Sequence, residues 1–181
     1  SANVEFHVQP LSLDSFGSPL HPYPGLTVSV CNLRPESRGS VHLRSASAGD
    51  APAIRPRYLT AEQDRIVAVE SLRLARALMQ TAAMRPHDPQ EVLPGPRMQS
   101  DADLAQAAGQ VGTTIFHPVG TARMGQDAMA VVDADLRVHG IAGLRVADAS
   151  IMPTIVSGNT HAPVTMIAEK AADLLLGARN G

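Results

Sequence analysis

Three short stretches in the last third of the chain decide its interpretation: FHPVGT at residues 116–121, LRVADAS at residues 144–150 and SGNTHAP at residues 157–163. Each one places polar or flexible residues at the edge of an apolar segment. Proteins commonly hold reactive groups in such positions, because the neighbouring rigid element fixes their orientation. We therefore treat the three stretches as parts of one candidate site.

The first half of the chain alternates short strands with turns and then enters a long helix. We predict strands at residues 3–8, 26–33 and 40–44, separated by a loop at 11–24 and a turn at 35–39. The turn is expected to join the second and third strands into a hairpin-like unit. Thr60 and Gln63 have the spacing of a capping box and predict a helix, whose wide apolar face is expected to pack against a sheet.

The second half contains a shorter helix, a group of short β segments and a final helix. We expect Ser100 to cap the shorter helix and Gly109 to stop it. Pro163 indicates the first turn of the final helix and Gly177 its end. The inward side of this helix is expected to carry Ile167, Ala168, Ala171, Leu174 and Leu175. Together these elements predict an α+β fold with a mixed or antiparallel sheet backed by helices.

Length and composition limit the kinds of partner that the chain can have. With 181 residues, 44% of them hydrophobic, the chain is long enough for one domain with its own core. Its formal net charge is −2 and both signs are interspersed, so we expect no nucleic-acid partner. No apolar run reaches the length that crosses a bilayer, so we expect no membrane-spanning segment in this part. The lone cysteine, Cys31, excludes an internal disulfide.

His117 is the strongest catalytic candidate among the residues. It precedes Pro118, which biases its backbone toward an extended conformation at the end of a β-like segment. An imidazole in this position suits proton transfer near neutral pH. The alternative is a histidine that only hydrogen-bonds a turn, and this is our interpretation of five others: His7, His21, His42, His87 and His139.

The residues before the final helix are candidates for holding an anionic group. Asn159, Thr160 and His161 lie where backbone N–H groups gather and the helix dipole stabilises negative charge. Ordinary helix capping is the alternative for all three residues, and it competes most strongly for Thr160 and His161. Asp148 follows a β segment, where its carboxylate could equally cap a turn.

Two other kinds of site find no support in the sequence. His117 and His161 have no nearby group of carboxylates or cysteines at ligand spacing, so we expect no metal site. The chain also contains no G-x-S-x-G nucleophile elbow, which argues against an esterase or lipase.

In this order, the three stretches resemble the C-terminal half of the glucose–methanol–choline (GMC) family of flavin-dependent alcohol oxidoreductases, in particular its choline-dehydrogenase-like members. The resemblance extends back through LRPESRGSVHLR at residues 33–44, which is similar to the family's mid-chain strand pair, and covers nearly the whole chain. It implies FAD as the cofactor and a small primary or secondary alcohol as the substrate, with hydride transfer from the alcohol to the flavin. The electron acceptor, and the choice between oxidase and dehydrogenase, stay open.

The resemblance also implies roles for individual residues. His117 corresponds to the base that accepts the hydroxyl proton, and Asn159 to the second active-site residue, which hydrogen-bonds the substrate oxygen. Asp148 and Ala149 are expected beside the ribityl chain and pyrophosphate of FAD. Three residues are expected to contact the flavin ring or lie near it: Asn159, Thr160 and His161.

The chain does not contain the Gly-rich dinucleotide-binding turn that the resemblance would lead one to expect. Its closest approach, Gly109 followed by Gly112, lacks the G-x-G-x-x-G spacing. We therefore expect the C-terminal part of a longer enzyme, with residues 1–130 as the substrate-side sheet and helices, and residues 131–181 returning to the FAD-binding domain. FAD binding would then need the N-terminal half, so the isolated chain is expected to be inactive and to hold no FAD.

Two other interpretations stay open. The chain could be a non-catalytic binding or structural module of the same fold, or a fragment with no role of its own. A G-x-G-x-x-G turn encoded upstream in the same polypeptide would favour the enzyme. We expect a cytoplasmic protein, although a signal in the N-terminal half would direct export, so export stays open.

Overall fold

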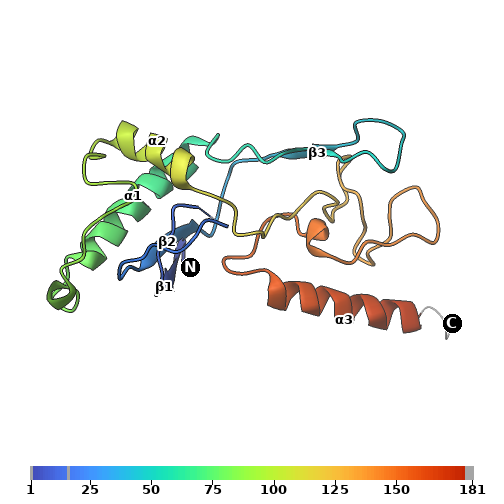
Figure 1. Ribbon diagram of the computed structural model, residues 1–181. Coiled ribbons are helices and arrows are strands. Elements are labelled where there is room, and N and C mark those ends of the chain that lie inside the picture. Colours follow the sequence, from blue (N-terminus) through green and yellow to red (C-terminus); the bar gives the residue numbers. More distant parts are fainter. Residues whose placement is uncertain (1, 16, 178–181) are drawn as a thin grey trace. The chain divides into compact units, whose positions relative to one another are not determined.

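The computed structural model describes residues 2–15 and 17–177. The chain forms two compact units, Ser1–Gly39 with Arg55–Thr113 and Ser40–Ile54 with Thr114–Gly181. Helices and short two-stranded sheets make up the regular structure, which confirms the predicted α+β class (Figure 1).

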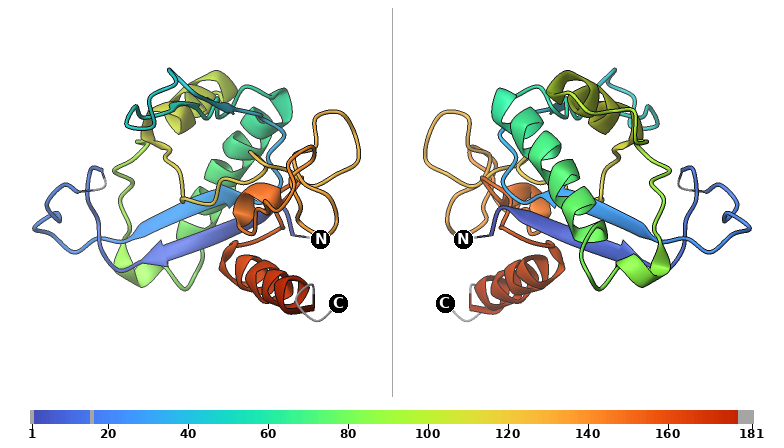
Figure 2. Two further views of the ribbon diagram at one scale, coloured as in Figure 1. Left: turned by 90° about the vertical axis from the view of Figure 1, so that its right-hand side faces the viewer. Right: turned by 90° about the vertical axis from the view of Figure 1, so that its left-hand side faces the viewer.

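The first unit is built from an antiparallel ribbon and two helices. Strands β1 (Val4–Gln9) and β2 (Thr27–Asn32) pair so that Phe6 faces Val30 and Val8 faces Val28. Helix α1 (Glu62–Met79) crosses one face of this ribbon and packs against β2 and α2 (Asp101–Val111) (Figure 2). The hydrophobic core of the unit consists of Leu33, Val67, Val69, Leu104 and Ala107.

The predicted capping box at the start of α1 is wrong. The N-cap is Ala61, one residue later than expected, and no side chain caps the helix there. The Thr60 hydroxyl instead donates to the carbonyl of Arg57, at 2.9 Å. Ser37, from the turn after β2, accepts the amide hydrogen of Ala61 at 3.0 Å. A contact from a distant segment therefore replaces the local cap that the sequence pattern predicted.

Strands β2 and β3 (Ser40–His42) do not form the expected hairpin, because β2 pairs with β1, while β3 pairs with β4 (Ala53–Arg55). The reason lies in the turn that follows β2. The carboxylate of Asp64 accepts the amide hydrogens of Glu36 and Ser37, both at 2.8 Å. This turn is therefore fastened to the first turn of α1.

Helix α1 buries a narrower face than its apolar pattern suggested. Its buried residues are Asp64, Val67, Val69 and Ser71. Ile66, Leu74 and Leu78 belong to the same apolar stripe but remain 38–48% exposed.

The start of α2 agrees with its prediction, and its end does not. Ser100 and Asp103 form a reciprocal capping box. Gly109 lies inside the helix, which continues to Val111 with Gly112 as its C-cap. An interior glycine costs about 1 kcal/mol, and burial of Leu104 and Ala107 on the inner face offsets this cost. The segment between α1 and α2 contains one 3₁₀ turn, η1 (Arg85–His87).

In the second unit, the last helix packs against segments that form turns and isolated bridges instead of strands. Helix α3 (His161–Gly177) buries Ile167 and Ala171 against a core of Val132, Leu136, Ile151 and Met152. The predicted β segments occur only as isolated bridges, which link Met124 to Val132, Val132 to Val138 and Arg137 to Arg145. Ala168 and Leu175 were expected to face inward but are exposed, because the buried face of the helix follows Val164, Ile167, Ala171 and Leu174.

Candidate active site

The segment that carries His117 is held by core packing and by backbone hydrogen bonds. Val119 packs against the core of the second unit. Gly120 has φ +88°, and a side chain there would lie 3.2 Å from the carbonyl oxygen of Met152. Directly after it, the amide of Ala122 donates to Ser150 at 3.0 Å and that of Met124 to Ile151 at 2.8 Å. The His117 segment and the 150–152 segment therefore lie side by side.

The backbone before His117 adopts an unusual conformation. Phe116 has φ +64°, in the left-handed region that costs a residue with a side chain roughly 1–2 kcal/mol. Its ring is 72% exposed, while His117 beside it is half-buried. Residues in such conformations gather at functional sites, where surrounding contacts hold them.

The Asp148 segment forms a short turn beside the His117 segment. Asp148 is the N-cap of η2 (Ala149–Ile151), and its carboxylate accepts the amide hydrogen of Ser150 at 2.8 Å. The Asp148 side chain is exposed, whereas Ala149 packs against the core. The carboxylate thus caps its own turn.

The start of α3 alternates exposed and buried side chains. The carbonyl oxygen of Thr160 accepts the amide hydrogen of Val164 at 3.0 Å, which makes Thr160 the residue at the helix end. Thr160 is only 6% exposed, while Asn159 and His161 on either side of it are exposed. Val164 packs into the core one turn later and fixes this end of the helix.

Thr160 and His117 form the contact that joins the start of α3 to the His117 segment. The Thr160 hydroxyl and Nδ1 of His117 share a hydrogen bond of 2.8 Å. Sequence reasoning placed Thr160 at the flavin or in a helix cap and missed this contact. The two residues are 43 positions apart, and no spacing pattern links them.

Two carboxylates in the chain that follows the His117 segment, Asp127 and Asp133, accept hydrogen bonds. The two hydrogen bonds of the Arg123 guanidinium to Asp127, at 2.5 and 2.8 Å, lower the pKa of that carboxyl to about 2. The Arg137 amide lowers the pKa of Asp133. Among the described residues, no carboxylate forms an ion pair with His117, so its ring is held by a neutral hydroxyl.

The start of α3 fits the pyrimidine edge of a flavin. That edge consists mainly of hydrogen-bond acceptors, and the first amides of a helix have no acceptor within the helix. The amides of His161 and Ala162 occupy these positions, next to the exposed side chain of Asn159. The turn at Asp148 fits a pyrophosphate only through its backbone, because a phosphate and an exposed carboxylate repel each other.

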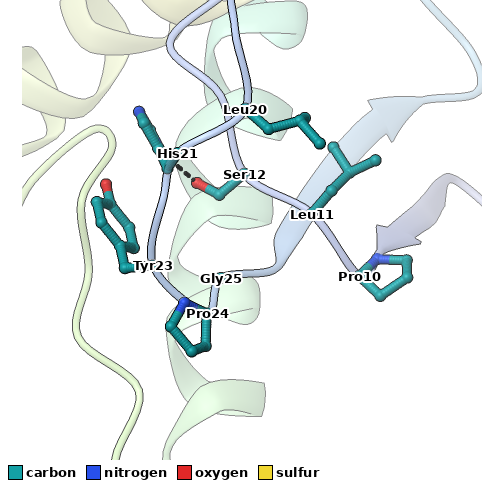
Figure 3. Close-up of a pocket in the computed structure, with 8 residues that line it drawn as sticks. All are labelled: Pro10, Leu11, Ser12, Leu20, His21, Tyr23, Pro24 and Gly25. Carbon is teal, nitrogen blue, oxygen red and sulfur yellow. Dashed lines mark hydrogen bonds between the residues drawn. The ribbon is translucent and has the colours of Figure 1, made fainter.

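The first unit contains a pocket of a different kind, lined by residues of the 10–25 loop (Figure 3). His21 forms hydrogen bonds with the Ser12 hydroxyl at 2.9 Å and with Asp14 at 3.1 Å, and its ring stacks on Tyr23. Its own amide donates to the carbonyl oxygen of Ser12 at 2.9 Å. Two of these bonds join Ser12 to His21. We therefore interpret the arrangement as structural: it holds the two ends of the loop together.

The described part of the chain contains neither a metal-binding cluster nor a membrane-spanning helix. Residues 2–15 and 17–177 contain no group of three or more His, Cys, Asp or Glu side chains that could hold a metal ion. Over the same residues, no helix is both long and apolar enough to cross a membrane.

Comparison with known proteins identifies the family. The C-terminal family model described as GMC oxidoreductase matches residues 35–168. The chain belongs to the GMC oxidoreductase family. It is 41% identical over 174 residues to an alcohol dehydrogenase [acceptor] of Pseudomonas putida, and 41% identical over 175 residues to an oxygen-dependent choline dehydrogenase of Klebsiella pneumoniae. These alignments cover 96% and 97% of the chain.

Solved structures of GMC enzymes have the same fold. Pyridoxine 4-oxidase from Mesorbium loti superimposes with a TM-score of 0.79 at 34% identity, over 88% of this chain and 31% of that one. A formate oxidase variant from Aspergillus oryzae superimposes with a TM-score of 0.83 at 32% identity, over 92% of this chain and 30% of that one. The relatives thus include an alcohol dehydrogenase and a choline dehydrogenase, and the similar solved structures include an FAD-dependent oxidoreductase from Chaetomium thermophilum.

The chain spans about a third of the length of the curated relatives that it matches, 32% for both of those named above. The names of the curated relatives and of the solved structures refer to different substrates, which include choline, pyridoxine and formate. Family membership therefore does not identify the substrate or the activity of the whole protein, and both are proposed below.

Proposed function

We propose that this chain is the C-terminal part of an FAD-dependent oxidoreductase that oxidises a small primary or secondary alcohol, with His117 as the base. The observation that carries the proposal is the bond between His117 and Thr160, because it holds an imidazole at the start of α3, and Asn159 directly precedes Thr160 in the sequence.

His117 has the geometry of a base that uses one of its two ring nitrogens. Nδ1 is engaged by Thr160, at 2.8 Å. Among the described residues, Nε2 has no protein partner, so this nitrogen is free to accept the hydroxyl proton of an alcohol. When bound, FAD supplies the acceptor for the hydride that leaves the same carbinol carbon. Loss of the proton to Nε2 and of the hydride from carbon together convert the alcohol to a carbonyl compound.

Asn159 is proposed to position the substrate. Its exposed amide lies one residue before Thr160 and can donate a hydrogen bond to the alcohol oxygen. A fixed donor at this oxygen orients the carbinol group for transfer of both hydrogens, and orientation of this kind is a major source of catalysis.

The remaining predicted residues are proposed to bind FAD. Thr160 and His161 contribute through the helix end, and Asp148 and Ala149 through the backbone of their turn. We further propose that residues 131–181 return to the FAD-binding domain and that residues 1–130 form the substrate side. The cytoplasmic location also stays a prediction.

The test is the anaerobic rate of flavin reduction by alcohols in the whole FAD-loaded protein, because this rate needs no knowledge of the electron acceptor. His117→Ala should lower the rate by about 10²–10⁴-fold, the usual contribution of a general base. Asn159→Ala should have a milder effect, because the proton acceptor remains. His161→Ala should mainly change flavin retention or redox behaviour. His139→Ala is the matched control, since His139 is exposed and, among the described residues, its ring forms a hydrogen bond only with the Gly125 carbonyl.

Two results would contradict the proposal. Full activity in His117→Ala, together with loss of activity in His161→Ala, would exchange the roles of the two histidines. A wild-type protein that binds FAD but is reduced by no alcohol, choline included, would favour the non-catalytic module.

A further inference from the structure

We propose that Thr160 is a positioning residue that selects the proton-accepting form of His117. This inference rests on the proposed function, since it concerns the same base. The bond between the Thr160 hydroxyl and Nδ1 of His117 carries it, together with the burial of Thr160.

The protonation state of His117 decides whether it can act. A neutral imidazole carries one hydrogen, on Nδ1 or on Nε2, and only the nitrogen without hydrogen accepts a proton. To accept the alcohol proton at Nε2, His117 must carry its hydrogen on Nδ1. A hydroxyl can donate to a ring nitrogen or accept from it, and in this tautomer it accepts: Nδ1–H donates to the oxygen of Thr160, at the 2.8 Å seen here.

A hydroxyl is suited to this task because it serves both states of the base. When Nε2 takes the alcohol proton, the ring becomes an imidazolium, and both ring nitrogens carry hydrogen. The Thr160 oxygen still accepts from Nδ1–H, and the bond strengthens because its donor is now charged. Thr160 therefore stabilises the protonated ring more than the neutral ring, and a preference of this kind lowers the barrier to proton transfer.

Thr160 is placed for this role rather than for helix capping. A typical N-cap hydroxyl accepts an amide hydrogen from the first turn of its own helix. The hydroxyl of Thr160 points to His117 instead, and the residue is 6% exposed. Because little water reaches Thr160, a water molecule cannot readily take the place of its hydroxyl in a variant that lacks this group.

The first test is the tautomer of His117, measured by ¹⁵N NMR on the whole protein labelled at histidine. The wild type should carry its hydrogen on Nδ1 at a pH where the ring is neutral. Thr160→Val, which keeps the side-chain shape but has no hydroxyl, should lose this preference. Thr160→Ser should restore it. Thr165→Val is the matched control, because the Thr165 hydroxyl bonds the carbonyl of His161 on the same helix.

The second test is the kinetics of the same variants with FAD bound. Thr160→Val should lower the rate of flavin reduction at saturating alcohol by about 10–100-fold, the range expected for loss of a hydrogen bond to a charged group. The apparent affinity for alcohol should change little, and Thr160→Ser should recover most of the rate.

The outcomes separate this inference from the proposed function. An unchanged His117 tautomer in Thr160→Val, or a Thr165→Val variant that is equally impaired, would overturn the role of Thr160. A protein that oxidises no alcohol but shows the expected change of tautomer would overturn the proposed function instead, while the contact itself would stand.

Discussion

Asp64 offers the sharpest test of how the first unit holds together. This carboxylate is 3% exposed and lies in the first turn of α1. One oxygen accepts from the Glu36 amide at 2.8 Å and from the Asn32 side chain at 3.2 Å. The other accepts from the Ser37 amide at 2.8 Å. Asp64 thus joins α1 to the end of β2 and to the turn that follows it.

Asp64→Asn keeps the shape of the side chain but replaces one acceptor oxygen with a donor NH₂ group. That group would face either the Ser37 amide or the pair formed by Glu36 and Asn32, so at least one buried donor loses its acceptor. A hydrogen bond to a charged group contributes about 1.5–3 kcal/mol, and an unsatisfied buried donor costs about 1–3 kcal/mol. We expect the free energy of unfolding to fall by about 3 kcal/mol.

The pH dependence provides a second measurement of the same bonds. Burial acts to raise the pKa of Asp64, but hydrogen bonds from Ser37, Glu36 and Asn32 outweigh it, so the pKa is lowered in the folded protein. A lowered pKa means that the stabilisation is present above the unfolded value of about 3.9 and is lost as pH falls through the folded value. The difference in stability between wild type and Asp64→Asn should therefore shrink below about pH 4.

The assay is urea unfolding of the purified protein, followed by circular dichroism at neutral and acidic pH. Glu62→Gln is the matched control, because it removes an exposed acid from the same helix turn, where the effect of charge on the helix dipole is below about 1 kcal/mol. Equal stability of wild type and Asp64→Asn, or a difference that does not depend on pH, would refute the reasoning.

Three further predictions concern one glycine in each unit and the cofactor. Gly120→Ala should destabilise the protein by about 1–2 kcal/mol in the same assay, because Gly120 has φ +88° and lies close to the Met152 carbonyl. Gly109→Ala should instead stabilise it by about 0.5–1 kcal/mol, since that glycine is inside α2 with open space around it. The 181-residue chain alone should not retain FAD through extensive dialysis, and a yellow protein after this treatment would contradict our assignment of most phosphate contacts to a separate Gly-rich turn.

Local patterns predicted the elements well where neighbouring residues determine them. The capping box of Ser100 and Asp103 and the final helix from the region of Pro163 to Gly177 are both present. The errors occur where a distant residue supplies the contact. Thr60 does not cap α1, because its hydroxyl bonds the Arg57 carbonyl. The Ala61 amide donates to Ser37 instead, a residue 24 positions away that no window around residue 60 contains.

The same limit applies to the candidate site. The stretches around His117, Asp148 and Asn159 could be recognised from the sequence, and all three lie in the second unit. The contact that orients His117 could not be recognised, because it joins residues 43 positions apart. Neither residue has a spacing that singles it out: a histidine before proline and a threonine before a helix are both common and have common local explanations.

The second unit orients its imidazole through packing rather than through regular structure, since isolated bridges and turns surround His117 on the chain. Val119 anchors one side of the contact in the core, and Val164 anchors the other. Two backbone bonds from the 122–124 segment to the 150–152 segment fix the register between them. Phe116 and Gly120 both have positive φ, so the chain leaves the extended conformation on each side of His117. The placement of His117 therefore depends on the core around α3 as much as on Thr160 itself.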